Sequence, residues 1–342
     1  MKSATPRSVR ATGRATLADV ARVAEVSPMT ASRALRGEPT VDAALVQRVQ
    51  AAAAKLGYLP DPAARALASR RSTHVAVLIP SLTNQLFVEL LEAAQRTLRS
   101  AGLQTLIGIT HYDPAEEEQL LREQLLHRPA GVLLTGLEQT RATRRLLAAE
   151  DTPCVTMMEM GSGPGTASVG FSQEAAAAAM TRHLLQRGRQ RIAFVAAQLD
   201  PRTLQRLAGW RLALAEAGRF DARLEWREPA ASSVGLGAQL FEQILAASPA
   251  VDAVFFCNDD LAQGALLAAL RLGVPVPGRI AVAGFNDLPE SAHTVPPLST
   301  VRTPRAAIGQ RAAELLVARI RDPARAAQHQ DLGFELMVRG SS

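Results

Sequence analysis

Residues 15–37 have the sequence ATLADVARVAEVSPMTASRALRG, which predicts two short helices joined by a tight turn. Thr16 is a hydroxyl residue of the kind that caps a helix. The apolar residues that follow it recur at the i, i+3, i+4 and i+7 spacing of one helical face: Leu17, Val20, Ala21 and Ala24. Ser27 then caps a second helix whose first position is Pro28. The stretch therefore predicts a helix-turn-helix.

The second helix of this pair has two contrasting faces. Its apolar face packs onto the first helix and consists of Ala31, Ala34 and Leu35. Its opposite face carries hydroxyls, a thioether and guanidiniums without a carboxylate: Met29, Thr30, Ser32, Arg33 and Arg36. Such a face suits the major groove of DNA. The alternative is an ordinary pair of helices with one basic face.

The positive charge of the chain is concentrated at its N-terminal end. The whole chain has a formal net charge of +6, whereas residues 1–72 contain 12 Lys and Arg against 5 Asp and Glu, a net charge of +7. A DNA backbone favours this placement, because bound cations release its counterions. A solvated basic tail is the alternative, but it leaves the coincidence of charge and motif unexplained.

Two further helices are expected after the helix-turn-helix. Residues 41–57 predict a third helix that ends at Gly57 and has one apolar stripe: Leu45, Val49, Ala52 and Leu56. The sequence YLP at 58–60 breaks the chain. The segment DPAARALAS at 61–69 has a cap and a first-position proline, but it is too short to be a stable helix alone. We therefore interpret it as a candidate switch.

From residue 73 onward, short apolar runs alternate with longer helical segments. Buried strands are predicted at HVAVLIPS (74–81), LQTLIGIT (103–110) and AGVLLTG (130–136). A loose linker, GSGPGTAS (161–168), precedes a second series that includes AVFFC (253–257). Alternating strands and helices predict parallel sheets with helices on both faces. The strands are too many for one sheet, so we expect an α/β domain of two doubly wound lobes.

Polar residues follow several of these strands. They are Pro80–Phe87, Glu159, Gln198–Arg206, Asn258–Asp260 and Asn286–Asp287. Ligands of such sheets bind at the carboxyl ends of the strands, so a cleft lined by these groups is expected there. The lining suits a small polyhydroxylated or anionic ligand. The alternatives are that Asn258 and Asp259 cap a helix, that Asn286 and Asp287 form a turn, and that Arg206 lies on the surface.

Several function classes find no support in the sequence. Cys154 and Cys257 lie far apart in apolar runs, which indicates buried thiols rather than a disulfide or a metal site. There is no glycine-rich phosphate loop, metal-ligand cluster or nucleophile elbow. We therefore expect no enzyme, no cofactor and no metal. No secretory signal or membrane span is recognisable, so a cytoplasmic protein is expected.

Residues 15–71 resemble the headpiece of the lactose-repressor (LacI/GalR) family of bacterial transcription factors. The residues that carry the resemblance are TLADVARVAEVSPMTASRAL and KLGYLPDPAARALAS. It extends through VDAVFFCNDDLAQGALLAALRLGVPVPGRIAVAGFND and VPPLSTV, and so spans nearly the whole chain. The resemblance implies a small all-α headpiece followed by an α/β effector domain like that of periplasmic sugar-binding proteins.

The implied domain boundaries follow from the same resemblance. The headpiece covers 1–60, the hinge helix and linker 61–72, and the effector-binding and dimerisation domain 73–342. Within that domain the first lobe is expected at about 73–171 and 299–328, and the second at about 172–298 and 329–342.

The resemblance also implies which residues contact DNA. The family's base-reading positions fall on Pro28, Met29 and Arg33. Arg33 is the candidate for a bidentate contact to guanine. In the hinge helix, Leu67 is the wedge between base steps, Ala64 lies against the minor-groove floor and Arg65 lies near phosphate. The other expected DNA contacts are Thr16, Leu17, Ser27, Thr30, Ser32, Arg36 and Tyr58.

The family's effector contacts fall on Ser81, Asn84, Phe87, Glu159, Arg206, Asn258, Asn286 and Arg305. Two of these depart from the family pattern, because Asn286 replaces an acidic group and Arg305 replaces a position that is often aromatic. Fewer anions and an extra cation predict an effector that is itself negative.

A narrower resemblance points the same way. The motifs PSLTNQLF, SVGF, AAQLDPRTLQR, CNDDLA and LGFELMVRGSS are similar to those of gluconate-operon repressors and other sugar-acid-sensing members of the family. This implies a homodimeric repressor that binds double-stranded operator DNA and responds to D-gluconate or a related sugar acid. The alternatives are a neutral sugar or purine effector and, in a different class, a solute-binding protein. A solute-binding protein would not explain the basic N-terminal end.

Overall fold

A computed structural model describes residues 15–59, 72–149, 152–161 and 167–342. The chain divides into two compact units, Met1–Ser72 and Thr73–Ser342. The predicted hinge helix, with Ala64, Arg65 and Leu67, lies outside the described residues. No helix of the described part is long and apolar enough to cross a membrane.

The first unit contains the predicted helix-turn-helix and the third helix. Its helices are α1 (Leu17–Val23), α2 (Pro28–Leu35) and α3 (Ala43–Lys55). The predicted caps are confirmed: Thr16 accepts a hydrogen bond from the backbone N–H of Asp19, and Ser27 accepts one from that of Thr30. Caps of this kind stabilise a helix by about 1 kcal/mol each. Small side chains fill the core between the helices: Val20, Ala21, Ala24, Ala31, Ala34, Val49, Ala52 and Ala53.

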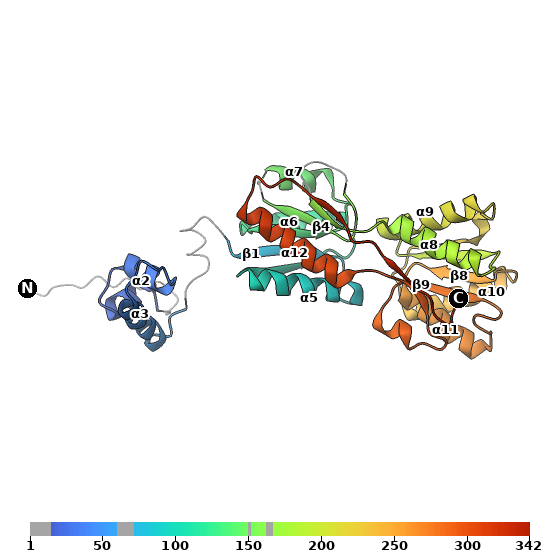
Figure 1. Cartoon of the computed structure of the whole chain (residues 1–342), viewed down its shortest axis with the longest axis horizontal. Helices are drawn as coiled ribbons and strands as arrows, with labels where there is room; N and C mark the ends of the chain where they lie inside the picture. The colour runs from blue at the N-terminus through green and yellow to red at the C-terminus, as the bar shows by residue number, and fades with distance from the viewer. Residues whose placement is uncertain (1–14, 60–71, 150–151, 162–166) are drawn as a thin grey trace, which may run out of the picture. The chain divides into compact units, whose positions relative to one another are not determined.

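The second unit consists of two lobes, each built on a six-stranded sheet (Figure 1). The first sheet has the order β11-β5-β4-β3-β1-β2, and its strands are parallel. Its strands are β1 (His74–Ile79), β2 (Gln104–Ile109), β3 (Gly131–Thr135), β4 (Cys154–Met157), β5 (Ala167–Gly170) and β11 (His329–Asp331). Its helices are α5 (Gln85–Ser100), α6 (Pro114–Leu126), α7 (Arg141–Ala149) and α12 (Arg305–Arg321).

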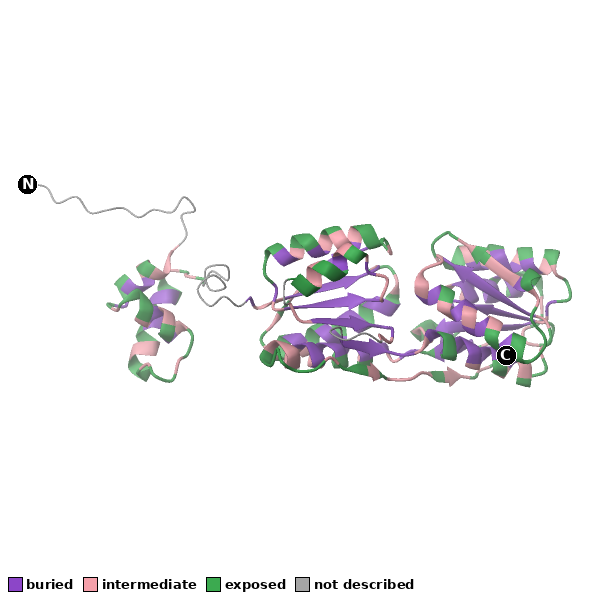
Figure 2. Cartoon of the chain, turned by 90° about the horizontal axis from the view of Figure 1, so that it is seen from above, coloured by how far each residue is buried: buried purple, intermediate pink, exposed green. Residues whose placement is uncertain are grey.

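The second sheet has the order β12-β10-β9-β8-β6-β7, in which only β12 is antiparallel to its neighbour. Its strands are β6 (Ile192–Ala197), β7 (Glu225–Glu228), β8 (Ala253–Phe256), β9 (Ala281–Asn286), β10 (Ser299–Arg302) and β12 (Glu335–Met337). The surrounding helices are α8 (Gln173–Gln186), α9 (Pro201–Glu216), α10 (Val234–Ala247), α11 (Asp259–Leu272), η1 (Ala222–Leu224) and η2 (Pro289–Ala292). Figure 2 shows buried residues along the strands and exposed ones on the outer faces of the helices.

Two expected lobe boundaries are wrong. Residues 299–302 form β10, which pairs with β9 of the second lobe rather than joining the first. Residues 329–331 form β11, which pairs with β5 of the first lobe rather than joining the second. The chain thus crosses between the lobes near 171–172, 303–304 and 332–334. The prediction missed this because β10 and β11 are short strands whose side is decided only by their ladder partners.

The expected linker 161–168 is also corrected at its end. Ala167 and Ser168 are buried and begin β5, which pairs in parallel with β4. Because β5 is flanked by β4 and β11, both of its edges are hydrogen-bonded. The two residues are small and follow a run rich in glycine, so a search for apolar runs did not detect the start of the strand.

Close helix packing fixes the elements that carry the cleft residues. A Cβ atom on Gly209 of α9 would lie 2.0 Å from the carbonyl oxygen of Glu174 in α8. A Cβ on Gly309 of α12 would lie 2.1 Å from the carbonyl oxygen of Leu90 in α5. Both distances are far shorter than any real contact, so only glycine lets these helix backbones meet.

Candidate functional sites

The basic face of α2 is presented to solvent as predicted. Met29 is 70% exposed, and Arg33 and Arg36 are also exposed, whereas Ala31 and Ala34 are buried against the rest of the headpiece. Pro28 occupies the first turn of α2, at the end from which such helices contact base edges. Met29 and Arg33 are four residues apart, so they lie on the same side of the helix.

A carboxylate accompanies this face, contrary to the expectation from α2 alone. Glu38, which follows the helix, contacts the Nε atom of Arg33 at 3.0 Å and the Nη2 atom of Arg36 at 3.0 Å. These pairs are exposed, and exposed ion pairs contribute little stability. An anion that bound this face would therefore displace Glu38 from both guanidiniums at small cost.

The remaining DNA candidates lie in different surroundings. Ser27 and Thr30 lie at the start of α2, where their hydroxyls are 2.8 Å apart and the backbone N–H of Thr30 donates to the Ser27 hydroxyl. Such a helix N-terminus is a place where phosphate binds. Leu17 and Tyr58 pack against the headpiece core. Thr16 and Asp19 cap each other, and Ser32 is half-buried.

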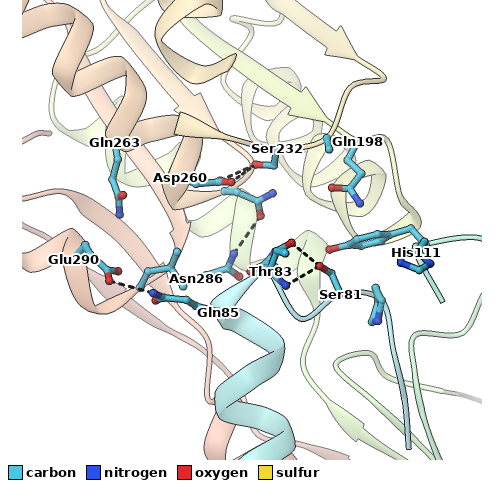
Figure 3. Close-up of a pocket in the computed structure, with 16 residues that line it drawn as sticks. Ser81, Thr83, Gln85, His111, Gln198, Ser232, Asp260, Gln263, Asn286 and Glu290 are labelled. Carbon is cyan, nitrogen blue, oxygen red and sulfur yellow. Dashed lines mark hydrogen bonds between the residues drawn. The ribbon is translucent and has the colours of Figure 1, made fainter. Parts of the chain in front are cut away.

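The second unit contains a pocket of about 430 Å³ between its two lobes (Figure 3). This volume falls within the range of small-molecule sites. Most of the lining is polar and comes from the carboxyl ends of strands in both sheets, as predicted. The lining residues are Pro80, Ser81, Thr83, Asn84, Gln85, His111, Tyr112, Gln198, Ala231, Ser232, Asn258, Asp260, Gln263, Asn286, Leu288 and Glu290.

Four of the eight predicted effector residues line this pocket: Ser81, Asn84, Asn258 and Asn286. Ser81 and Thr83 hold the loop after β1 through a hydroxyl contact of 2.9 Å. Asn84 caps α5 through the backbone N–H of Leu86, so the first lobe contributes a rigid wall. Phe87 lies behind that wall, where it is buried edge-to-face against the ring of Tyr112.

Arg206 lies directly behind Asn258 rather than on the surface. Its guanidinium is buried, packs over the ring of Phe285 at 3.9 Å and donates to Gln173, to the carbonyl of Cys257 and to Oδ1 of Asn258. These bonds use Nε and Nη1, and Nη2 donates to no partner among the described residues. Burial lowers the pKa of Arg206, because removal from water disfavours the charged guanidinium. An anion at the unused donor would stabilise that charge.

Asn286 presents an unused acceptor at the same place. Its Nδ2 donates to Oδ1 of Asn258 over 3.1 Å, but its own Oδ1 is buried and has no partner among the described residues. Its backbone has a φ of 117°, which is a strained conformation for a residue with a side chain. Buried polar atoms without partners and strained backbones both mark functional sites.

Positive φ angles recur around the whole pocket. His111 and Tyr112 after β2, and Gln198 after β6, share this conformation with Asn286, and all four line the pocket. The strain bends the chain back at the strand ends, which turns these side chains into the cavity. Burial raises the pKa of Tyr112 to about 12, so its hydroxyl remains a donor at neutral pH.

Two carboxylates also line the pocket. Asp260 accepts the hydroxyl of Ser232 on both oxygens, at 2.6 and 2.7 Å, and burial raises its pKa. Glu290 accepts a hydrogen bond of 3.3 Å from Gln85 of the opposite lobe (Figure 3). Carboxylates are acceptors for sugar hydroxyls, and each retains lone pairs beyond those used here.

Glu159 and Arg305 lie outside the pocket lining. Glu159 belongs to the first lobe and is buried against α9 of the second, where it accepts from Gln205, from the backbone of Leu137 and from Arg202. Burial raises its pKa, and Arg202 opposes this effect. Arg305 binds Glu89 and the backbone carbonyls of Asn286 and Asp287. Its charge is thus already paired, which removes it as the extra cation expected for an anionic effector.

Sequence reasoning missed several lining residues: His111, Tyr112, Ser232, Gln263 and Glu290. His111 and Tyr112 directly follow a predicted strand, so the strand-end rule was the signal that could have found them. Ser232 lies in a loop and Glu290 in the short helix η2, and the position of each depends on contacts with residues far along the chain. No spacing of residues in the sequence predicts those contacts.

Comparisons with known proteins find relatives of both units of the chain. The model of bacterial regulatory proteins of the lacI family matches residues 16–61, and that of periplasmic binding protein-like domains matches residues 181–342. The HTH-type transcriptional regulator GntR of Pseudomonas aeruginosa is 57% identical over 336 residues, which cover 98% of each chain. GntR of Escherichia coli K12 is 36% identical over 96% of this chain and 98% of its own.

Solved structures give the same result. The transcription regulator GntR from Chromobacterium violaceum is 49% identical, with a TM-score of 0.76 over 79% of this chain and 99% of its own. The lac repressor dimer bound to operator and the anti-inducer ONPF is 26% identical, with a TM-score of 0.85 over 96% and 99%. The headpiece and the two-lobed domain together define a DNA-binding transcriptional regulator. The chain belongs to the LacI family of bacterial regulatory proteins.

Proposed function

We propose that this regulator is a repressor that binds a pseudo-palindromic operator as a homodimer and is released from it by a sugar acid, with D-gluconate as the leading candidate. Because operator DNA lies in the bacterial cytoplasm, the protein acts there. The free Nη2 donor of the buried Arg206, beside Asn258 and Asn286, carries the proposal of an acidic effector.

The chemistry of the pocket supports a ligand with a carboxylate and several hydroxyls. A buried guanidinium with a free donor pairs best with a carboxylate, because charge-assisted hydrogen bonds are the strongest available there. Asp260 and Glu290 accept hydroxyl donors, and the free Oδ1 of Asn286 accepts one more. The two carboxylates would repel a second acidic group. An aldonic acid with one carboxylate satisfies both requirements, and the motifs shared with gluconate-operon repressors favour gluconate.

Titration of the full-length protein by calorimetry tests the effector assignment. D-gluconate, 2-ketogluconate, glucose and hypoxanthine are compared at the same pH and salt concentration. Binding of gluconate but not glucose is the expected result. Binding of glucose or hypoxanthine instead, or of none of the four, would overturn the sugar-acid assignment and leave the DNA-binding function intact.

The mechanism of release is a shift between two populations of the effector domain. Ligand binding stabilises one arrangement of the lobes, and this arrangement disfavours the hinge helices that hold the operator. The proposed wedge, Leu67, lies outside the described residues, so its role rests on the family resemblance. Leu67→Gly should abolish specific operator binding and leave effector binding unchanged. Full operator affinity in this variant would exclude the wedge, and a rise in operator affinity with ligand would make the ligand a corepressor.

The proposed homodimer has a candidate contact on the second lobe. A groove of about 530 Å³ between α11 and the segment after η2 is lined mostly by apolar side chains. Leu267, Leu270 and Val295 at this groove are 59%, 66% and 73% exposed. Clustered apolar exposure of this kind marks an interaction surface. Leu270→Glu should dissociate the dimer in sedimentation experiments, whereas Leu212→Glu, at an exposed leucine of α9, should not.

A further inference from the structure

A buried arginine joins the two lobes at the side of the pocket. Arg202 lies in the first turn of α9 in the second lobe, and it is only 2% exposed. Its Nη1 contacts Oε1 of Glu138 at 3.0 Å and Oε2 of Glu159 at 3.3 Å. Glu138 follows β3 and Glu159 follows β4, so both partners belong to the first lobe. The neighbouring Gln205 adds a second bond across the lobes, at 2.6 Å, to Glu159.

We propose that Arg202 is a positioning residue for the ligand pocket, a lock whose ion pairs with Glu138 and Glu159 hold the two lobes in the arrangement that binds ligand. Arg202 does not line the pocket and acts through its neighbours. The Cζ atom of Arg202 lies 5.9 Å from the ring centre of Tyr112, which lines the pocket from the first lobe. Gln198, on the facing wall, lies four residues before Arg202 in the same lobe.

The residues around Arg202 leave space for the ion pair and orient its guanidinium. A Cβ atom on Gly136 would lie 2.4 Å from Nη1 of Arg202 and 2.2 Å from Oε2 of Glu138, so the ion pair occupies the space above that glycine. Within its own lobe, Arg202 is oriented by a 3.2 Å contact between its Nε and Asp200. The carboxylates of Asp200, Glu138 and Glu159 raise the pKa of Arg202 despite its burial, which by itself would lower it.

The burial of Arg202 and Glu159 makes the lock sensitive to the loss of one partner. Buried charges that lose their counterion are strongly unfavourable, whereas replacing the whole pair is often tolerated. Oε2 of Glu138 and Nη2 of Arg202 already lack partners among the described residues. If the lobes move apart, the buried ion pairs of Arg202 with Glu138 and Glu159 break. Because breaking a buried pair is costly, the lobes are restricted to few arrangements.

Hydrogen exchange of the full-length protein without ligand tests the lock directly. The backbone N–H of Leu137 donates to Glu159 over 3.2 Å and reports on the first-lobe side of the lock. Arg202→Met should increase exchange in residues 136–139 at least tenfold. The matched control is Arg211→Met, because Arg211 lies on the same helix but pairs with Glu225 inside the second lobe, at 2.6 and 2.7 Å. It should leave exchange in 136–139 unchanged.

A compensated variant separates positioning from a purely structural role. Arg202→Met combined with Glu138→Gln and Glu159→Gln removes the two first-lobe charges that lose their counterion, so its thermal midpoint should return close to that of the wild type. Exchange in 136–139 should remain high, and affinity for D-gluconate should stay at least tenfold weaker. Wild-type exchange and affinity in this variant, or exchange that rises equally in both lobes of Arg202→Met, would overturn the lock.

The affinity measurement rests on the proposed function, but the exchange measurement does not. If wild-type protein fails to bind gluconate, the effector assignment is wrong. Hydrogen exchange in the ligand-free variants then still tests whether Arg202 holds the lobes together. If gluconate binds and exchange in 136–139 is unaffected by Arg202→Met, the lock fails while the proposed function stands.

Discussion

Glu38 bridges Arg33 and Arg36, with 3.0 Å between a carboxylate oxygen and each guanidinium, on the exposed basic face of α2 that is predicted to bind DNA. The contact competes with phosphate for the same donors. Glu38→Gln should therefore raise affinity for any duplex DNA several-fold, with a steeper dependence on salt. Fluorescence anisotropy at two salt concentrations measures this. Glu92→Gln, which makes the same charge change on α5, should have no comparable effect; equal gains in both variants would refute a local role for Glu38.

Arg33 is predicted to contact a guanine base. Replacing Arg33 should therefore reduce the specificity of the protein for its operator sequence. Arg33→Ala should weaken operator binding by about 1–3 kcal/mol, roughly 5- to 150-fold, because the bidentate contact is lost. Substitution of the contacted guanine should then cost little further affinity. Thr30→Ala is the comparison, since a lost phosphate contact weakens binding to all sequences alike. A uniform loss in Arg33→Ala as well would assign Arg33 to the phosphates.

Arg206 should separate DNA binding from ligand response. Arg206→Met retains much of the volume over the Phe285 ring but removes the donors to Gln173 and Asn258. A charge-assisted hydrogen bond is worth about 1.5–3 kcal/mol, so ligand affinity should fall at least tenfold. Operator binding should persist and become insensitive to D-gluconate. Release at the wild-type gluconate concentration, in a variant with normal thermal stability, would remove Arg206 from the effector site.

Glu117 should make the stability of the protein depend on pH. Burial raises its pKa from 4.5 to about 7, and the charge of Glu138 adds to this rise. The folded state thus holds a proton that the unfolded state loses above about pH 4.5. The resulting stabilisation, on the order of 3 kcal/mol, is present below that pH and is lost as pH rises through 7.

Glu117→Gln removes this contribution and should flatten the pH profile. Urea unfolding followed by circular dichroism at pH 5, 6, 7 and 8 measures the difference between the two proteins. The contribution of Asp259, whose pKa burial raises to about 6, remains in both proteins and cancels in the comparison. Parallel pH profiles for variant and wild type would show that Glu117 is ionised in the folded state.

Local signals in the sequence predicted the headpiece well. Thr16 and Ser27 cap the helices that they precede, because capping depends on residues only two or three positions away. The apolar runs that begin β1 and β8 were equally visible, since strands buried on both faces are continuously apolar. Glu38 was overlooked because it lies beyond the helix and folds back onto its exposed face.

The cleft was predicted in outline, and its composition depended on contacts that sequence spacing does not encode. The strand-end rule located Ser81, Asn258 and Asn286. It could not show that Arg305 is bound by Glu89, 216 residues away, and by backbone carbonyls. The family resemblance predicted Arg305 in the cleft from its position alone. The contacts of Arg202 were not predicted, because its partners Glu138 and Glu159 lie in the other lobe.

The three crossings between the lobes, near 171–172, 303–304 and 332–334, bear on how the second unit responds to proteolysis. Neither lobe is a continuous piece of chain. After β10 of the second lobe, the chain returns to the first lobe to form α12 and β11, and it then enters the second lobe again to form β12. A single cut at any crossing leaves the lobes covalently tied through the other two. A nicked protein should therefore elute at its intact size under native conditions and separate into fragments only in denaturant.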